Sequence, residues 1–107
     1  MKGVKFQLNR YPFKYAVLFA IAMRNQDMKV DEIMNDLSPD FGNEKQFTEK
    51  MVRYHMDSFV CVGMAKVTKE KINSDGNLEM TYCITPFGME RTKFLPDEWK
   101  NLLSKAV

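Results

Sequence analysis

Apolar residues recur along the chain with helical spacing in some segments and with strict alternation in others. The first apolar run, Ala16 to Met23, follows Tyr11-Pro12, and proline in a first turn suits a helix that ends near Arg24. A helix that is apolar on every face must be surrounded. It is enclosed either by the rest of a small domain or by a second copy of the chain.

A second helical pattern begins after the short polar stretch Gln26 to Lys29. Asp31 and Glu32 suit its first turn, because carboxylates are favourable at the positive end of the helix dipole. Ile33, Met34 and Leu37 lie on one face. We expect the helix to be broken by Ser38-Pro39-Asp40-Phe41-Gly42.

The third helical pattern is the longest. Asn43 and Gln46 have the spacing of a capping box, which predicts a helix from about residue 44 to Val62. Its apolar stripe consists of Val52, Met56, Phe59 and Val60. Gly63 stands where a left-handed residue ends a helix.

The period then changes to two. Met64 to Ile72 and Leu78 to Ile84 alternate apolar and polar positions, and the Asp-Gly pair between them is typical of a hairpin turn. This predicts a two-stranded ribbon. Thr85-Pro86 then begins a helix that includes Met89, Phe94 and Leu95, Pro96 ends it, and Asp97 to Ala106 form a last amphipathic helix.

This order of elements predicts an α+β fold that is mostly α, a winged helix-turn-helix with three helices, a two-stranded wing and one or two C-terminal helices. We expect one domain, residues 1–107, with a core at 12–95 and a C-terminal helix at 96–107 that is a candidate dimerisation element. The segment Met51 to Val67 resembles the recognition helix and wing of ArsR-like regulators, written V-R-Y-H-L-D-x-L-x-x-x-G-L-V. Tyr82-Cys-Ile-Thr-Pro-Phe-Gly88 resembles the Y-x-L-T-P-x-G that closes the wing in PadR, MarR and related repressors.

The resemblance implies a small transcriptional regulator, a repressor, that binds double-stranded DNA in a sequence-specific manner. The helix around 44–62 would read the major groove, and the wing around 69–77 would contact the backbone. The DNA-contacting candidates on the helix are Lys45, Gln46, Glu49, Lys50, Arg53 and Tyr54, and those on the wing are Lys69, Lys71, Asn73, Ser74 and Asn77. An ordinary solvated helix face and a strand edge protected by lysines are the structural alternatives.

The charge distribution bears on this hypothesis. The formal net charge of the chain is +2, but residues 1–30 carry +5 and residues 31–64, which include the expected recognition helix, carry −4. Phosphate neutralisation supplies most non-specific affinity for DNA, so an acidic middle segment opposes it. The alternative function is a winged-helix module that binds another protein.

Phe94, Leu95, Trp99, Leu102 and Leu103, together with the first helix, are the expected dimerisation residues. A homodimer would match a palindromic site through its twofold symmetry. The alternative is that these side chains close over the core of their own chain.

Other chemistry finds little support in the sequence. The single histidine, His55, and the two cysteines, Cys61 and Cys83, lack the spacing of a metal site, and no nucleophile arrangement or phosphate-binding glycine loop is present. We therefore expect no enzymatic activity, metal or cofactor. The longest apolar run has eight residues, too few to cross a membrane, and we expect a cytoplasmic protein with reduced cysteines.

Overall fold

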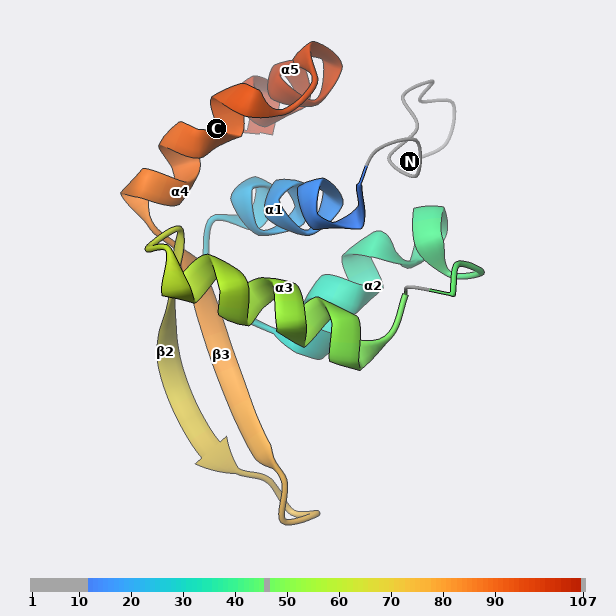
Figure 1. Ribbon diagram of the computed structural model, residues 1–107, viewed down its shortest axis with the longest axis vertical. Helices are drawn as coiled ribbons and strands as arrows, with labels where there is room; N and C mark the ends of the chain where they lie inside the picture. Colours follow the sequence, from blue (N-terminus) through green and yellow to red (C-terminus); the bar gives the residue numbers. More distant parts are fainter. Residues whose placement is uncertain (1–11, 46, 107) are drawn as a thin grey trace.

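The computed structural model describes residues 12–45 and 47–106, and its fold is α+β and mostly helical (Figure 1). Three helices come first in the described residues, and one very short strand lies between the first and the second. They are followed by a long β-hairpin and by two further helices with a 3-10 turn between them. In chain order the elements are α1 (Phe13–Arg24), β1 (Met28–Lys29), α2 (Val30–Phe41), α3 (Glu49–Cys61), β2 (Ala65–Ile72), β3 (Leu78–Ile84), α4 (Pro86–Arg91), the 3-10 turn η2 (Thr92–Phe94) and α5 (Asp97–Ala106).

Helix α1 is the centre of the core. Every side chain from Ala16 to Ala22 is at most 7% exposed. Elements of the same chain enclose it, with α5 on one side and α2 and α3 on the other (Figure 1). The uninterrupted apolar pattern is thus accounted for within one chain. The bidentate ion pair of Arg24 with Asp36, with distances of 2.8 and 2.7 Å, ties the end of α1 to α2.

Helix α2 continues through most of the expected break. The sequence predicted that Ser38-Pro39-Asp40-Phe41-Gly42 would break the helix, but the helix includes Pro39 and ends only at Phe41, immediately before Gly42. Phe41 is fully buried, and its ring meets that of Phe13 edge-on with 5.0 Å between the ring centroids. Packing of this aromatic pair outweighs the loss of one backbone hydrogen bond at a proline in the last turn.

Helix α3 begins later than expected. Thr48, not Asn43, is the N-cap, and its Oγ1 accepts a 3.1 Å hydrogen bond from the backbone N–H of Met51. The expected capping box at 43–46 is therefore wrong as the start of this helix. Turns occupy the preceding segment, where the N–H of Glu44 donates to Phe41 and that of Phe47 to Glu44. The buried side of α3 is as predicted, with Val52, Met56 and Phe59 inside, and Gly63 follows it with a φ of 83°.

The sheet has three antiparallel strands in the order β1-β3-β2, where the sequence predicted two. Strand β1 has only two residues, which is too short for an alternation to be visible. Tyr82 lies at the centre, opposite Met28 on one side and Val67 on the other. The register shifts at Thr68, and the predicted Asp-Gly turn contains Gly76 at a φ of 83°. The hairpin projects away from the helices (Figure 1).

The C-terminal helices return to the core. Thr85 caps α4 as predicted, accepting from the N–H of Gly88, and also donates to the carbonyl of Gly63 at 2.6 Å. A Cβ atom at Gly88 would overlap the carbonyl oxygen of Met64, so only glycine allows α4 this close to the start of β2. Trp99 of α5 is fully buried.

Candidate nucleic-acid interface

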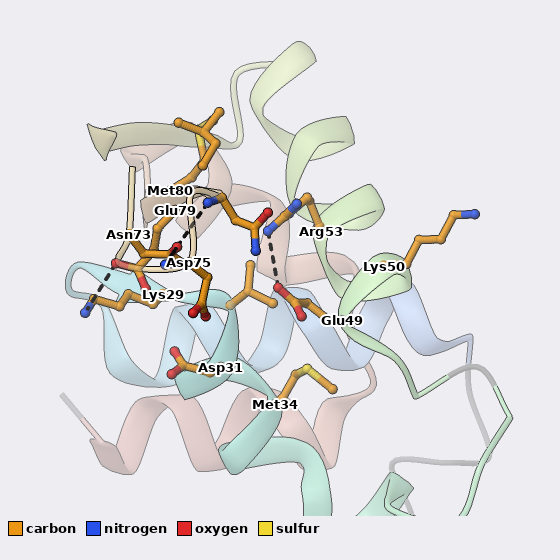
Figure 2. Close-up of a pocket in the computed structure, with 13 residues that line it drawn as sticks. Lys29, Asp31, Met34, Glu49, Lys50, Arg53, Asn73, Asp75, Glu79 and Met80 are labelled. Carbon is orange, nitrogen blue, oxygen red and sulfur yellow. Dashed lines mark hydrogen bonds and ion pairs between the residues drawn. The ribbon is translucent and has the colours of Figure 1, made fainter. Parts of the chain in front are cut away.

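An open cleft of about 710 Å³ lies between the N-terminal halves of α2 and α3 and the turn of the hairpin (Figure 2). Its walls therefore come from three elements that are separate in the sequence. The lining residues are Lys29, Val30, Asp31, Met34, Glu49, Lys50, Arg53, Asn73, Asp75, Asn77, Leu78, Glu79 and Met80.

The cleft brings together part of the predicted site. Glu49, Lys50 and Arg53 from α3 and Asn73 and Asn77 from the hairpin all line it. The other candidates lie elsewhere. Tyr54, Lys69, Lys71 and Ser74 are exposed outside the lining, Lys45 is exposed in the turn before α3, and Gln46 lies outside the described residues. Lys45 is not on α3, contrary to the prediction, because the helix begins only after Thr48.

The polar face of α3 is only partly engaged by the protein itself. An Nη of Arg53 donates to Oε2 of Glu49 at 3.2 Å, one turn earlier in the helix. The Nε of Arg53 is buried and has no hydrogen-bond partner among the described residues. Lys50 forms no ion pair with any described residue, and Figure 2 shows it directed away from the cleft. Tyr54, on the next turn, is 61% exposed.

The hairpin turn is ordered by Asn73. Its Oδ1 accepts hydrogen bonds from the backbone N–H groups of Asp75 and Asn77, at 2.9 and 3.1 Å. Because this oxygen is already used, Asn73 supports the turn and has only its amide NH₂ left for a ligand. Glu79 lies 3.8 Å from the Nζ of both Lys29 and Lys71, which joins the two outer strands through β3.

The lining carries more negative than positive charge. It contains the cations Lys29, Lys50 and Arg53 and the carboxylates Asp31, Glu49, Asp75 and Glu79. Asp31 and Asp75 point toward one another across the cleft, and neither forms an ion pair within the described part of the chain (Figure 2). This agrees with the acidic charge of residues 31–64 in the sequence, and it places part of that charge on the surface expected to meet DNA.

A hydrogen bond joins α3 to β3. The hydroxyl of Tyr82 donates to Oδ1 of Asp57 at 2.9 Å, and Tyr82 is only 1% exposed. Burial, with the hydrogen bond to Asp57, raises the pKa of Tyr82 well above its ordinary value, and Arg53 opposes this weakly. The pair could not be predicted from the sequence, because its members are 25 residues apart and each fits its own local pattern.

His55 packs among aromatic rings. Its ring centroid lies 5.7 Å from that of Phe13 and 5.5 Å from that of Tyr54. Burial lowers the pKa of His55, and the nearby positive charge of Lys14 lowers it further. Among the described residues, no group of three or more His, Cys, Asp or Glu side chains is arranged to hold a metal ion.

The residues expected to form a dimer surface have two different environments. Leu95, Trp99 and Leu103 are at most 8% exposed within one chain, and the ring of Trp99 lies 5.3 Å from that of Phe19 on α1. These three side chains close over the core of their own chain, which was the alternative interpretation. Leu102 is half-buried, and Phe94 is 61% exposed.

Neither protein-family models nor curated proteins give a match to this chain. Within the described ranges, no helix combines the length and the apolar character that crossing a membrane requires.

Proposed function

We propose that this chain is a winged helix-turn-helix protein that binds double-stranded DNA and regulates transcription, as a repressor. Helix α3 would lie in the major groove, and the hairpin would be the wing that contacts the backbone. The order of α2, α3 and the hairpin supports this assignment, as does the sheet order β1-β3-β2. The likeness of Met51 to Val67 and of Tyr82 to Gly88 to segments of repressors supports it from the sequence.

The observation that carries the proposal is that α3 and the hairpin turn border one open surface. Arg53 of α3 shares the cleft with Asn73 and Asn77 of the hairpin, and Lys50 borders the cleft with its side chain directed outward. A duplex lying along this surface would meet the N-terminal half of a helix and a projecting turn together. In proteins that use a helix in this way, the N-terminal residues of the helix contact the base edges.

The side chains on this surface suit different contacts. Arg53 can exchange its 3.2 Å contact with Glu49 for a base edge, and its guanidinium can bind the O6 and N7 atoms of guanine together. Lys50 and Tyr54 are exposed beside it and can reach phosphates or bases. Lys69 and Lys71 on the exposed strand β2 would contact phosphates, which position the protein without reading sequence.

The experiment that tests the proposal is a selection of bound fragments from random duplex DNA, followed by affinity measurement on the recovered sequence. A short common sequence, bound far more tightly than random duplex, is the expected result. The double variant Lys50→Ala/Arg53→Ala should lose this preference. Lys105→Ala, which removes one exposed cation of α5 away from the cleft, is a control for the loss of a positive charge elsewhere on the chain. Absence of enrichment with folded protein would overturn the proposal.

One observation favours a second function, a module that binds the basic segment of another protein. The cleft has four carboxylates, and of its three cations Arg53 and Lys29 are each already paired with one of them. A surface that reads DNA usually concentrates unpaired cations. The two functions require partners of opposite charge, because the carboxylates of Asp31 and Asp75 would repel the phosphates of DNA and attract a basic peptide.

A further inference from the structure

Two large aromatic side chains remain exposed where the chain leaves the hairpin and returns to the core. Phe87 at the start of α4 is 47% exposed, and Phe94 at the end of η2 is 61% exposed. The guanidinium carbon of Arg91 lies 5.7 Å from the centroid of the Phe87 ring and 4.4 Å from that of Phe94. The three side chains therefore form one continuous surface, with an arginine between two phenylalanine rings.

We propose that this surface binds a second copy of the chain. It consists of Phe87, Glu90, Arg91, Lys93 and Phe94, and is called the α4 patch below. Aromatic residues and arginine are the residue types most enriched at protein interfaces, and exposed aromatic side chains grouped together mark such sites more strongly than scattered ones. This inference does not depend on DNA binding.

The charges of the α4 patch favour a copy of itself over other partners. Lys93 lies 3.3 Å from Glu90 and 5.5 Å from the ring of Phe94, so both signs of charge flank the rings. Both charged side chains are more than half exposed. Across a twofold axis, the same surface of each copy meets that of the other. Such a surface must therefore contain both the positive and the negative member of every ion pair that it forms with its copy. Glu90 can then pair with Lys93 of the partner subunit, while the guanidinium of Arg91 stays over the rings of Phe87 and Phe94 in its own chain. A partner of uniform charge would be repelled by either Glu90 or Lys93.

The rest of the C-terminal region is less suited to this role. The apolar side of α5 is used inside the chain, by Trp99 and Leu103. Its remaining described surface is polar, with Asp97, Glu98, Asn101, Ser104 and Lys105 exposed. The α4 patch also lies beyond the C-terminal end of α3, whereas the cleft is bordered by the N-terminal end of that helix (Figure 1). A dimer through the α4 patch leaves the cleft open in both subunits.

Sedimentation velocity tests the proposal with chain concentrations of about 1 to 100 μM. The unmodified chain should dimerise in this range, and Phe87→Ser/Phe94→Ser should weaken the dimer at least about tenfold. The matched control is Ile72→Ser/Leu78→Ser, which removes two similarly exposed apolar side chains, 65% and 47%, at the tip of the hairpin. The control should leave the dimer unchanged. A folded, monomeric unmodified chain, or equal weakening in both variants, would overturn the proposal.

A charge exchange identifies the contact itself. Glu90→Lys alone and Lys93→Glu alone should each weaken self-association, because like charges then face each other across the twofold axis. An equimolar mixture of the two variants should form a heterodimer, since every facing pair is again of opposite sign. The double variant on one chain should dimerise again for the same reason. If neither the mixture nor the double variant restores the dimer, the assignment of Glu90 and Lys93 to the interface is wrong.

Discussion

Tyr82 and Asp57 are joined by a 2.9 Å hydrogen bond that fixes α3 against the centre of the sheet. Tyr82 is paired with Met28 and Val67 in the neighbouring strands, so its position is set by the sheet. Asp57 lies one turn beyond Arg53, whose guanidinium borders the cleft. The angle between α3 and the hairpin, on which the proposed DNA surface depends, is therefore held by a partly buried polar contact between the buried Tyr82 and the exposed Asp57.

Tyr82→Phe should lower the free energy of unfolding by about 1 to 2 kcal/mol, because it removes one hydrogen bond to a carboxylate without changing the packed ring. The difference from the unmodified chain should shrink above about pH 10. At this pH Tyr82 ionises in the unfolded chain but stays protonated in the folded chain, because burial raises its pKa. The unmodified chain therefore loses stability as the pH rises. The variant has no hydroxyl at this position and does not show this loss. Urea unfolding of both proteins at pH 8 and pH 11 measures it. A constant difference across this range would contradict the assignment.

The start of α3 can be tested by capping variants. Thr48→Ala should destabilise the chain by about 1 kcal/mol, because it removes the acceptor for the N–H of Met51. Asn43→Ala should change stability by less than about 0.5 kcal/mol, since Asn43 is exposed and precedes the helix by several residues. Chemical unfolding gives both values. A larger loss of stability for Asn43→Ala than for Thr48→Ala would instead place the start of the helix at Asn43.

Two glycines should respond differently to alanine. Gly88→Ala should cost about 3 kcal/mol, because the new Cβ would overlap the carbonyl oxygen of Met64 and separate α4 from β2. Gly76→Ala has open space and should cost about 1 kcal/mol, for its positive φ alone. Thermal unfolding of the two variants compares them. A Gly88→Ala protein as stable as Gly76→Ala would show that α4 does not pack this closely.

The elements were predictable where a local pattern decided them. The all-apolar run of α1, the Asp-Gly turn and the Thr85 cap each predicted one local structure, although the run left open whether its own domain or a second copy encloses the helix. The start of α3 could not be predicted in this way, because Asn43 and Thr48 are both good N-caps and only the turns at residues 42–45 separate them. Pro39 stays helical because of the burial of Phe41, and β1 exists because β3 lies beside it.

Of the candidate site, the polar face of α3 could be predicted because it is the complement of an apolar stripe. The carboxylates could be counted from the sequence, but not placed. Asp31 was assigned to a favourable first turn and Asp75 to a hairpin turn, and only the fold brings them face to face.

Removing these two carboxylates distinguishes the two proposed functions. Asp31→Asn/Asp75→Asn should tighten DNA binding, because two negative charges leave a surface that faces phosphates. It should weaken capture of a lysine-rich peptide if the cleft binds a basic protein segment instead. Fluorescence anisotropy with a labelled duplex and a labelled peptide measures both. Asp97→Asn/Glu98→Asn, on the exposed start of α5, makes the same change in net charge and should alter neither affinity.

The most direct measurement of the central claim is the affinity for random duplex DNA as a function of salt concentration. The proposal predicts that log K falls linearly with log salt, with a slope of about −0.9 for each phosphate contacted. Lys69→Ala and Lys71→Ala should each flatten this slope by about 1, whereas Arg53→Ala should weaken the selected sequence by about 1 to 3 kcal/mol and relax its specificity. Affinity at or weaker than about 10⁻⁴ M at physiological salt, from a folded chain, would contradict DNA binding.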